Sequence, residues 1–103
     1  MTPLLVLTTV GANFDVKNLA THLVEKRLAA CVNTIPQVHS VYRWQGTIES
    51  DSEQMLLIKT VDERLEALRI ALFAMHPYEV PEFVVIQPAE LSDAYRAWLF
   101  SSV

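Results

Sequence analysis

The hydrophobic and polar positions along the chain follow first a strand pattern and then a helix pattern. Residues 4–10 form a short apolar run with β-branched members that ends at Gly11, which is typical of a buried strand. Over residues 15–30 the apolar side chains recur every three or four positions and charged side chains fill the opposite face, which predicts a helix. Asp15 or Asn13 is a suitable N-cap for it.

The middle of the chain predicts a long β-hairpin. Residues 31–46 are rich in Val, Ile, Thr, Tyr and Trp, and residues 54–60 form a second run of the same character. Proline has no N–H to donate to a ladder, so Pro36 marks the first run as an edge strand or as a bulged one. The acidic residues 49–53 are expected to form the turn between the two strands.

The rest of the chain predicts a helix, a strand and a last helix. Thr60 and Glu63 match a capping box at the start of the second helix, and Pro77 ends that helix because the residue before a proline avoids helical geometry. Residues 83–87 are expected to form the fourth strand. Ser92 can cap the last helix.

The first six predicted elements, strand–helix–strand–strand–helix–strand, follow the split β-α-β plan of ferredoxin-like domains. The predicted class is therefore an α+β sandwich, with a four-stranded antiparallel sheet, two helices on one face, a long β-hairpin and an extra C-terminal helix. One such domain takes up residues 1–103, the whole chain. The other face of the sheet is expected to be left bare.

Composition gives a reason to expect self-association. Hydrophobic residues make up 51% of the 103 residues and charged residues 19%, while a domain of this size buries only about 65% of its surface. No apolar run reaches the roughly 18 to 20 residues of a membrane span, and the first residues lack the basic part of a signal peptide. We therefore expect no membrane partner, and we expect the apolar surplus to form a buried subunit interface.

Charge, glycine and cysteine content argue against several classes of protein. A net charge of −4 disfavours a nucleic-acid binder, and two glycines leave no glycine-rich phosphate loop. The single cysteine, Cys31, has no internal disulfide partner, which predicts a cytoplasmic location. Residues 8–13, the loop after the first strand, contain neither the cysteines of a Cu(I) chaperone nor the arginine of an acylphosphatase-like phosphate site.

The densest polar segment spans residues 76–82. His76, Tyr78, Glu79 and Glu82 place an imidazole, a phenol and two carboxylates within seven residues, held extended by two prolines. These groups are the parts of a metal site or of an acid–base site. A histidine just after a helix is also commonly no more than a C-terminal stop near the last carbonyls, and the sequence leaves both interpretations open.

Three other residues have two interpretations each. Cys31 is either a small buried hydrophobe or a thiolate, and Lys59 is either a lysine that lies along apolar surface or a charge placed in a pocket. Trp44 belongs to a core or interface, or it walls a cleft. No set of nucleophile, base and orienting residue is recognisable, so no enzyme is expected and no organic cofactor is implied.

Several blocks of the sequence resemble the CutA family of divalent-cation tolerance proteins. They are RLAACVN at 27–33, YRWQG at 42–46, KT at 59–60, HPYEVPE at 76–82 and YRAWL at 95–99, in the order of the family and along essentially the whole chain. The resemblance implies a cytoplasmic homotrimer of ferredoxin-like subunits, built like the PII signalling proteins. It also implies that hairpin strands pair across subunit boundaries.

For function, the resemblance implies a role in tolerance of divalent metals, copper among them. Cys31 and His76 occupy the family positions discussed as copper ligands. Cu²⁺ or another divalent cation would bind weakly through His76, with Glu79 or Glu82 and with Cys31 as a further candidate ligand. Some relatives carry a further cysteine in the first loop, where this chain has Gly11, Ala12 and Asn13. A single thiolate and an imidazole per subunit form an incomplete ligand set for copper.

The alternative function is that of a PII-like signalling or scaffold trimer. It would bind a small ligand or a protein partner in clefts between subunits, and Lys59 indicates an anionic group on that ligand. The residues expected to line the cleft are Trp44, Lys59, His76, Tyr78, Glu79 and Glu82.

Overall fold

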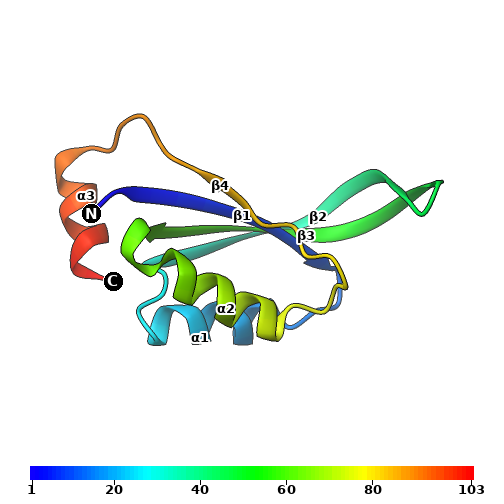
Figure 1. Cartoon of the computed structure of the whole chain (residues 1–103), viewed down its shortest axis with the longest axis horizontal. Helices are drawn as coiled ribbons and strands as arrows, with labels where there is room; N and C mark the ends of the chain where they lie inside the picture. The colour runs from blue at the N-terminus through cyan, green and yellow to red at the C-terminus, as the bar shows by residue number, and fades with distance from the viewer.

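The computed structural model describes all 103 residues as one sheet with helices packed against it (Figure 1). In chain order the elements are β1 (Pro3–Gly11), α1 (Val16–Glu25), β2 (Cys31–Trp44), β3 (Thr47–Val61), the 3-10 turn η1 (Asp62–Arg64), α2 (Leu65–Met75), β4 (Val84–Ile86) and α3 (Asp93–Ser101). The strand order is β2-β3-β1-β4 and every neighbouring pair is antiparallel. This confirms the predicted α+β class and the four-stranded antiparallel sheet of the predicted ferredoxin-like plan.

Helices α1 and α2 cover one face of the sheet, and the opposite face carries no helix along most of its length (Figure 1). Successive side chains of a strand point to opposite faces. In β1, Val6, Thr8 and Val10 point to the helices and are buried, whereas Leu5 and Leu7 point the other way. Leu5 is only half-buried. The bare face predicted from the element order is therefore present in the subunit.

The start of α1 agrees with the sequence prediction, and its end does not. The Asp15 carboxylate accepts a hydrogen bond from the Asn18 N–H at 3.1 Å, as an N-cap should. The helix stops at Glu25 instead of continuing to residue 30, because Arg27 takes a left-handed conformation with φ of 57° and turns the chain toward β2. None of the helices is long and apolar enough to cross a membrane.

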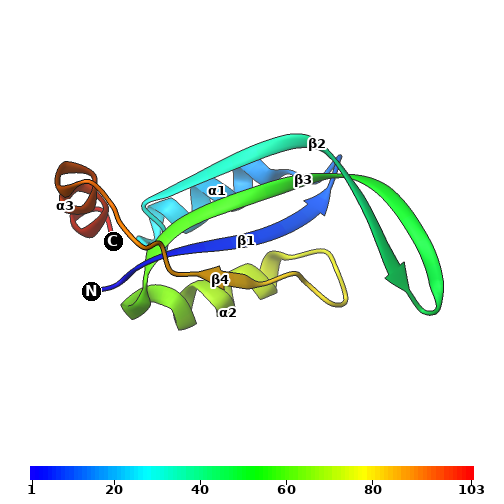
Figure 2. The same ribbon diagram turned by 90° about the horizontal axis from the view of Figure 1, so that it is seen from above.

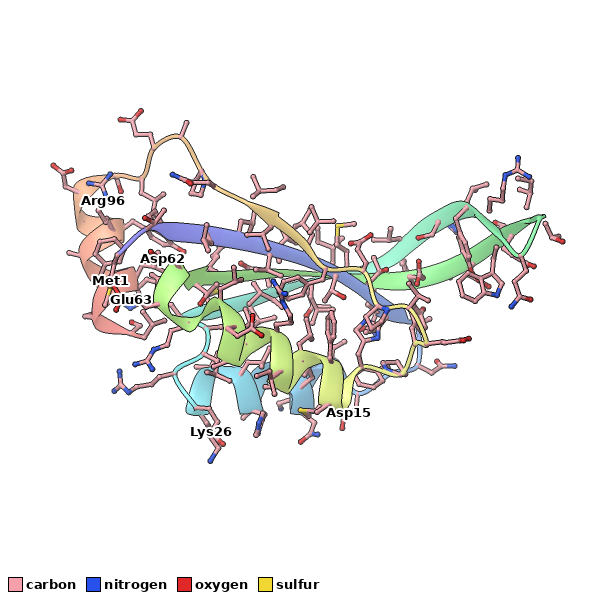
Figure 3. All side chains as sticks on the ribbon, in the orientation of Figure 1. Met1, Asp15, Lys26, Asp62, Glu63 and Arg96 are labelled. Carbon is pink, nitrogen blue, oxygen red and sulfur yellow. The ribbon has the colours of Figure 1, made fainter.

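The predicted capping box is wrong. Thr60 lies inside β3, where its hydroxyl donates to the Leu28 carbonyl at 2.7 Å, and α2 begins only after η1. Asp62 instead accepts the Thr2 N–H at 2.8 Å and ties the start of the chain to this corner. Figure 3 shows Asp62 and Glu63 beside Met1, near α3 and at the end of the molecule away from the hairpin.

The hairpin is longer than predicted and turns at a different place. Its two-residue turn is Gln45–Gly46, with φ of 49° and 80°, the left-handed pair that joins antiparallel strands tightly. The acidic residues 49–53, predicted to form the turn, lie inside β3 and pair with residues 38–42 of β2. The hairpin extends beyond the body of the subunit (Figures 1 and 2).

The prediction that Pro36 marks a bulged edge strand is confirmed. β2 is the outermost strand next to β3, and its register shifts between Ile35 and Val38. Gln37, in the interruption, takes a φ of 59°. The shift accompanies the change of direction of the hairpin that Figure 2 shows.

Candidate functional site

The site is built around His76, the residue that ends α2. Its N–H still donates to the Leu72 carbonyl at 2.8 Å, but its backbone is extended, as expected of a residue before proline. The residue is buried, with 9% of it exposed. Residues 77–82 then run from the end of the helix toward β4.

Both ring nitrogens of His76 are engaged in hydrogen bonds. Nδ1 lies 3.1 Å from the Tyr78 backbone nitrogen, whose N–H can only donate, so Nδ1 is the acceptor and the proton is on Nε2. Nε2 then lies 3.0 Å from the Thr9 carbonyl and 3.1 Å from the Thr8 hydroxyl. Burial lowers the pKa of His76 below its ordinary value, which keeps the ring neutral in this arrangement.

Tyr78 connects the loop to the hairpin. Its hydroxyl donates to the Glu53 carboxylate at 2.5 Å, and Glu53 is buried with only 6% of it exposed. Burial and this hydrogen bond raise the pKa of Tyr78. The phenol therefore stays protonated and remains a donor to Glu53.

A groove of about 730 Å³ opens beside this pair, between the hairpin and residues 77–82. Its aromatic walls are Tyr42, Trp44 and Tyr78, and its acidic side chains are Glu53, Glu79 and Glu82. Neither lysine nor arginine lines it.

The outer part of the groove wall carries a further tyrosine–carboxylate pair. The hydrogen bond that Tyr42 donates to the Asp51 carboxylate raises the pKa of Tyr42 to about 12. Both members of this pair stand on the exposed hairpin. The phenol of Tyr42 is thus fixed next to a carboxylate, as that of Tyr78 is.

The structure brings together only part of the predicted site. Trp44, Tyr78, Glu79 and Glu82 line the groove, and His76 lies next to it through its hydrogen bond to Thr9, which is also a lining residue. Residues that sequence reasoning missed are Thr8, Thr9, Tyr42 and Glu53. Glu53 was predictable in principle, because it continues the every-second-residue pattern of Leu57 and Met55 toward the hairpin.

Cys31 and Lys59 lie elsewhere. They are paired across β2 and β3, and Lys59 faces Leu5 of β1, which places both on the bare face of the sheet. The Lys59 ammonium lies 5.9 Å from the centre of the Tyr95 ring, in a separate pocket of about 190 Å³. His76 instead contacts the Thr8 side chain, which points to the helix face.

These positions bear on whether one subunit can hold a metal ion. No three His, Cys, Asp or Glu side chains of the chain come close enough together to form a metal site. Neither nitrogen of His76 offers a free lone pair unless a hydrogen bond breaks. A single subunit therefore does not fit a complete copper site, and only Glu79 and Glu82 of the implied ligands share the groove.

Comparison with known proteins identifies the family. A sequence model of the CutA1 divalent ion tolerance protein matches residues 4–102. The chain belongs to the CutA family. The resemblance noted from the sequence is confirmed, and the CutA family is a divalent-ion tolerance family rather than a known family of enzymes.

Individual CutA relatives agree in sequence and in fold. The divalent-cation tolerance protein CutA of Thermus thermophilus is 45% identical over 94 residues, which is 91% of each chain. The human protein CutA is 45% identical over 83 residues, which is 81% of this chain and 46% of the human one. The solved Cut A1 structure from Thermus thermophilus superposes with a TM-score of 0.93 at 42% sequence identity and covers 98% of both chains. The solved CutA1 structure from Oryza sativa superposes with a TM-score of 0.94 at 36% sequence identity and covers 100% of this chain and 94% of the rice chain.

Proposed function

We propose that the protein acts in divalent-cation tolerance as a PII-like homotrimer in the cytoplasm. The observation that carries the trimer is the bare apolar face of the sheet. Leu5, Leu7, Met55 and Leu57 lie on this face along its central strands, and Leu5 and Met55 are only half-buried in the subunit. The edge residues of the same face are more exposed, at 46% for Ile35, 44% for Val84 and 42% for Ile86.

Burying that face in a trimer removes apolar area from water, worth about 25 cal/mol for each Å². Strand pairing across the subunit boundary would also protect the edge strand β2, which otherwise leaves a long row of backbone groups unpaired. The hairpin carries apolar residues beyond the body, with Val41 71% and Ile48 59% exposed. Contacts with a neighbouring subunit would cover them.

Light scattering after size-exclusion chromatography tests the trimer. We expect a mass three times the 11.7 kDa of the chain, because the bare face has no other cover. A monomer at micromolar concentration would refute the proposal.

The cytoplasmic location is supported by the single free cysteine, which suits a reducing compartment. Family membership alone does not supply it, since one solved relative is called periplasmic and one plant relative chloroplastic. Fractionation of cells that express the protein at native level is the direct measurement.

We further propose that Cu²⁺, or another divalent cation, binds only weakly. The supporting geometry is that Glu79 and Glu82 line one groove, while His76 must first release the Tyr78 N–H. Cys31 lies on the other side of the sheet from the His76 ring, so it would join the site only across a subunit boundary. Carboxylates alone are poor copper ligands compared with imidazole or thiolate.

Calorimetric titration with Cu²⁺ ranks these ligands. We expect the double variant Glu79→Gln with Glu82→Gln to lose most of the heat of binding, and His76→Gln or Cys31→Ser to lose less. Glu25→Gln, at the exposed end of α1, is the matched control and should bind as wild type does. If all four variants bind Cu²⁺ equally well, the assignment of these residues as ligands is wrong.

A second function is favoured by the groove itself, which is large enough for a small organic ligand. In this role the trimer is a sensor or scaffold whose clefts bind a metabolite. The residues that line the groove indicate the chemical class of that ligand.

A further inference from the structure

We propose that the groove between the hairpin and residues 77–82 binds an organic cation, an ammonium or guanidinium group on a short apolar chain. The inference deepens the sensor function proposed above and rests on its groove, and it does not need copper binding. The cation proposed here is opposite in charge to the anionic ligand that the sequence predicts from Lys59. That lysine lies in the separate pocket beside Tyr95 and is not among the residues that line this groove.

The charged groups of the groove favour a cationic ligand. Glu53, Glu79 and Glu82 line it, and none of the three takes part in an ion pair within the chain. All the lysine and arginine side chains of the protein lie outside the lining. The one basic side chain among the lining residues is the imidazole of His39. The groove thus presents several carboxylates and no fixed cation to a ligand.

Glu53 is a buried carboxylate in the wall of the groove. Only 6% of it is exposed, and the single side-chain donor that reaches its carboxylate is the Tyr78 hydroxyl. A carboxylate has room for several donors, and a buried charge is costly unless a counter-charge compensates it. A ligand that places an N–H cation beside Glu53 would supply both the missing donors and the opposite charge.

The aromatic and apolar walls of the groove favour an organic cation over a bare metal ion as its ligand. Tyr42, Trp44 and Tyr78 line the same groove as the carboxylates, and aromatic faces attract ammonium and guanidinium groups. Val38 and Val80 add apolar surface, which a methylene chain can cover. A hydrated metal ion gains little from such walls, and the chain brings no three metal ligands together.

The size of the groove is compatible with such a ligand. Its volume of about 730 Å³ lies inside the range of roughly 300 to 1,000 Å³ that small-molecule sites occupy. The hydroxyl groups of Tyr42 and Tyr78 are already bound to carboxylates, which leaves their rings as walls.

The test uses a matched set of probes with short alkyl chains on the assembled protein: butylguanidinium, butylammonium, butanol and butyrate. Binding is read from the fluorescence of Trp44 in a Trp98→Phe background, because Trp98 is on α3, away from the groove. We expect saturable binding of the two cations, weakened by salt, and no binding of butanol or butyrate over the same range. Equal binding of butyrate, or no binding of either cation, overturns the proposal.

Variants locate the site. Glu53→Gln is expected to weaken butylguanidinium binding about tenfold, the loss of one hydrogen-bonded charge. If that buried substitution unfolds the protein, Glu79→Gln with Glu82→Gln provides the same test from the loop, and Glu25→Gln is the unchanged control. Unchanged affinity in the glutamine variants would show that the probe binds elsewhere and overturn the proposal.

Parallel measurements separate this inference from the proposed function. Light scattering reports the trimer and calorimetry with Cu²⁺ reports metal binding, so either can fail while the cation probes still bind. If the glutamine variants lose the trimer and wild type binds no probe, the groove holds a basic side chain of a second copy. The small-molecule proposal is then wrong.

Discussion

Tyr78 and Glu53 lie far apart in the sequence and form the most buried carboxylate contact of the groove. Replacing Tyr78 by Phe leaves the Glu53 carboxylate buried without its donor. We expect a loss of about 1 to 3 kcal/mol in the free energy of unfolding, measured by urea denaturation at one fixed protein concentration. Tyr95→Phe is the matched control, since the ring that faces Lys59 is kept. Equal stability of the two variants would contradict a structural role for the contact.

His76 makes stability depend on pH in a defined direction. Burial lowers its pKa in the folded protein, while the unfolded chain has the ordinary value of about 6.5. The unfolded state therefore binds the proton first, and the stability that the neutral ring contributes above a pH of about 6.5 is lost as the pH falls toward the folded pKa. Protonation would also turn Nδ1 into a donor facing the Tyr78 N–H.

The measurement is urea unfolding at a series of pH values from about 7.5 down to about 5.5, above the range where carboxylates titrate. We expect the wild-type free energy of unfolding to fall across this range and that of the His76→Gln variant to fall less. His39→Gln, an exposed histidine on the hairpin, is the control and should keep the wild-type slope. A His76→Gln variant with the same slope as wild type would assign the effect to another group.

At the scale of elements, the hairpin turn depends on backbone conformation alone. Gly46 has a φ of 80° and nothing within 4 Å of a Cβ built there, so Gly46→Ala is unfavourable only through its backbone. We expect it to cost about 1 kcal/mol. Gln45 takes a φ of 49°, and Asn suits the first position of this turn better, so Gln45→Asn should stabilise slightly.

Thermal unfolding of both variants checks the prediction. Because the two substitutions are expected to shift the melting temperature in opposite directions, each is the control for the other. A destabilising Gln45→Asn together with a neutral Gly46→Ala would mean that the turn adopts another conformation in solution.

The sequence predicts the existence and order of the elements better than their ends. β1, α1, α2 and the bulge at Pro36 follow from an apolar run, from helical periodicity or from the chemistry of proline, whereas the end of α1 and the start of α2 differ from the prediction. Residues 49–53 were misplaced because that part of the hairpin lies beyond the helices and is mostly exposed, so it shows no alternation of apolar and polar residues. The pattern of Thr60 and Glu63 is a capping box in the sequence, but Thr60 continues the buried side of β3.

The sequence predicts only those residues of the candidate site that follow one another along the chain. Residues 76–82 stand out in the sequence because several polar side chains follow one another there. The contacts of His76 with Thr8 and Thr9 and of Tyr78 with Glu53 depend on which strand is adjacent to the loop. For the same reason the sequence groups Lys59 with the groove residues, although Lys59 lies farther along the same face of β3 than Glu53 and Met55, in the pocket beside Tyr95.

At the scale of the whole molecule, apolar and acidic surfaces occupy neighbouring parts of the same side of the sheet, because Glu53 and Met55 line the groove from the face of β3 that carries Leu57. The bare face of the sheet carries the apolar surplus, and the groove beside the hairpin collects carboxylates. If three copies share the bare face, the hairpins extend toward neighbouring subunits and the grooves come to lie near the subunit boundaries. One architecture would then use the same open sheet for assembly and for binding.

The apolar face can be tested by placing one charge on it. Leu57 points to the bare face from β3, next to Leu7. In the isolated subunit a glutamate there keeps contact with water, whereas in a trimer three copies of it would be buried at an apolar interface without partners, at a cost of several kcal/mol. We expect Leu57→Glu to shift the mass seen by light scattering from trimer to monomer, with the circular dichroism of a folded subunit. Ala67→Glu, on the exposed side of α2, should remain trimeric, and a Leu57→Glu trimer would place the interface elsewhere.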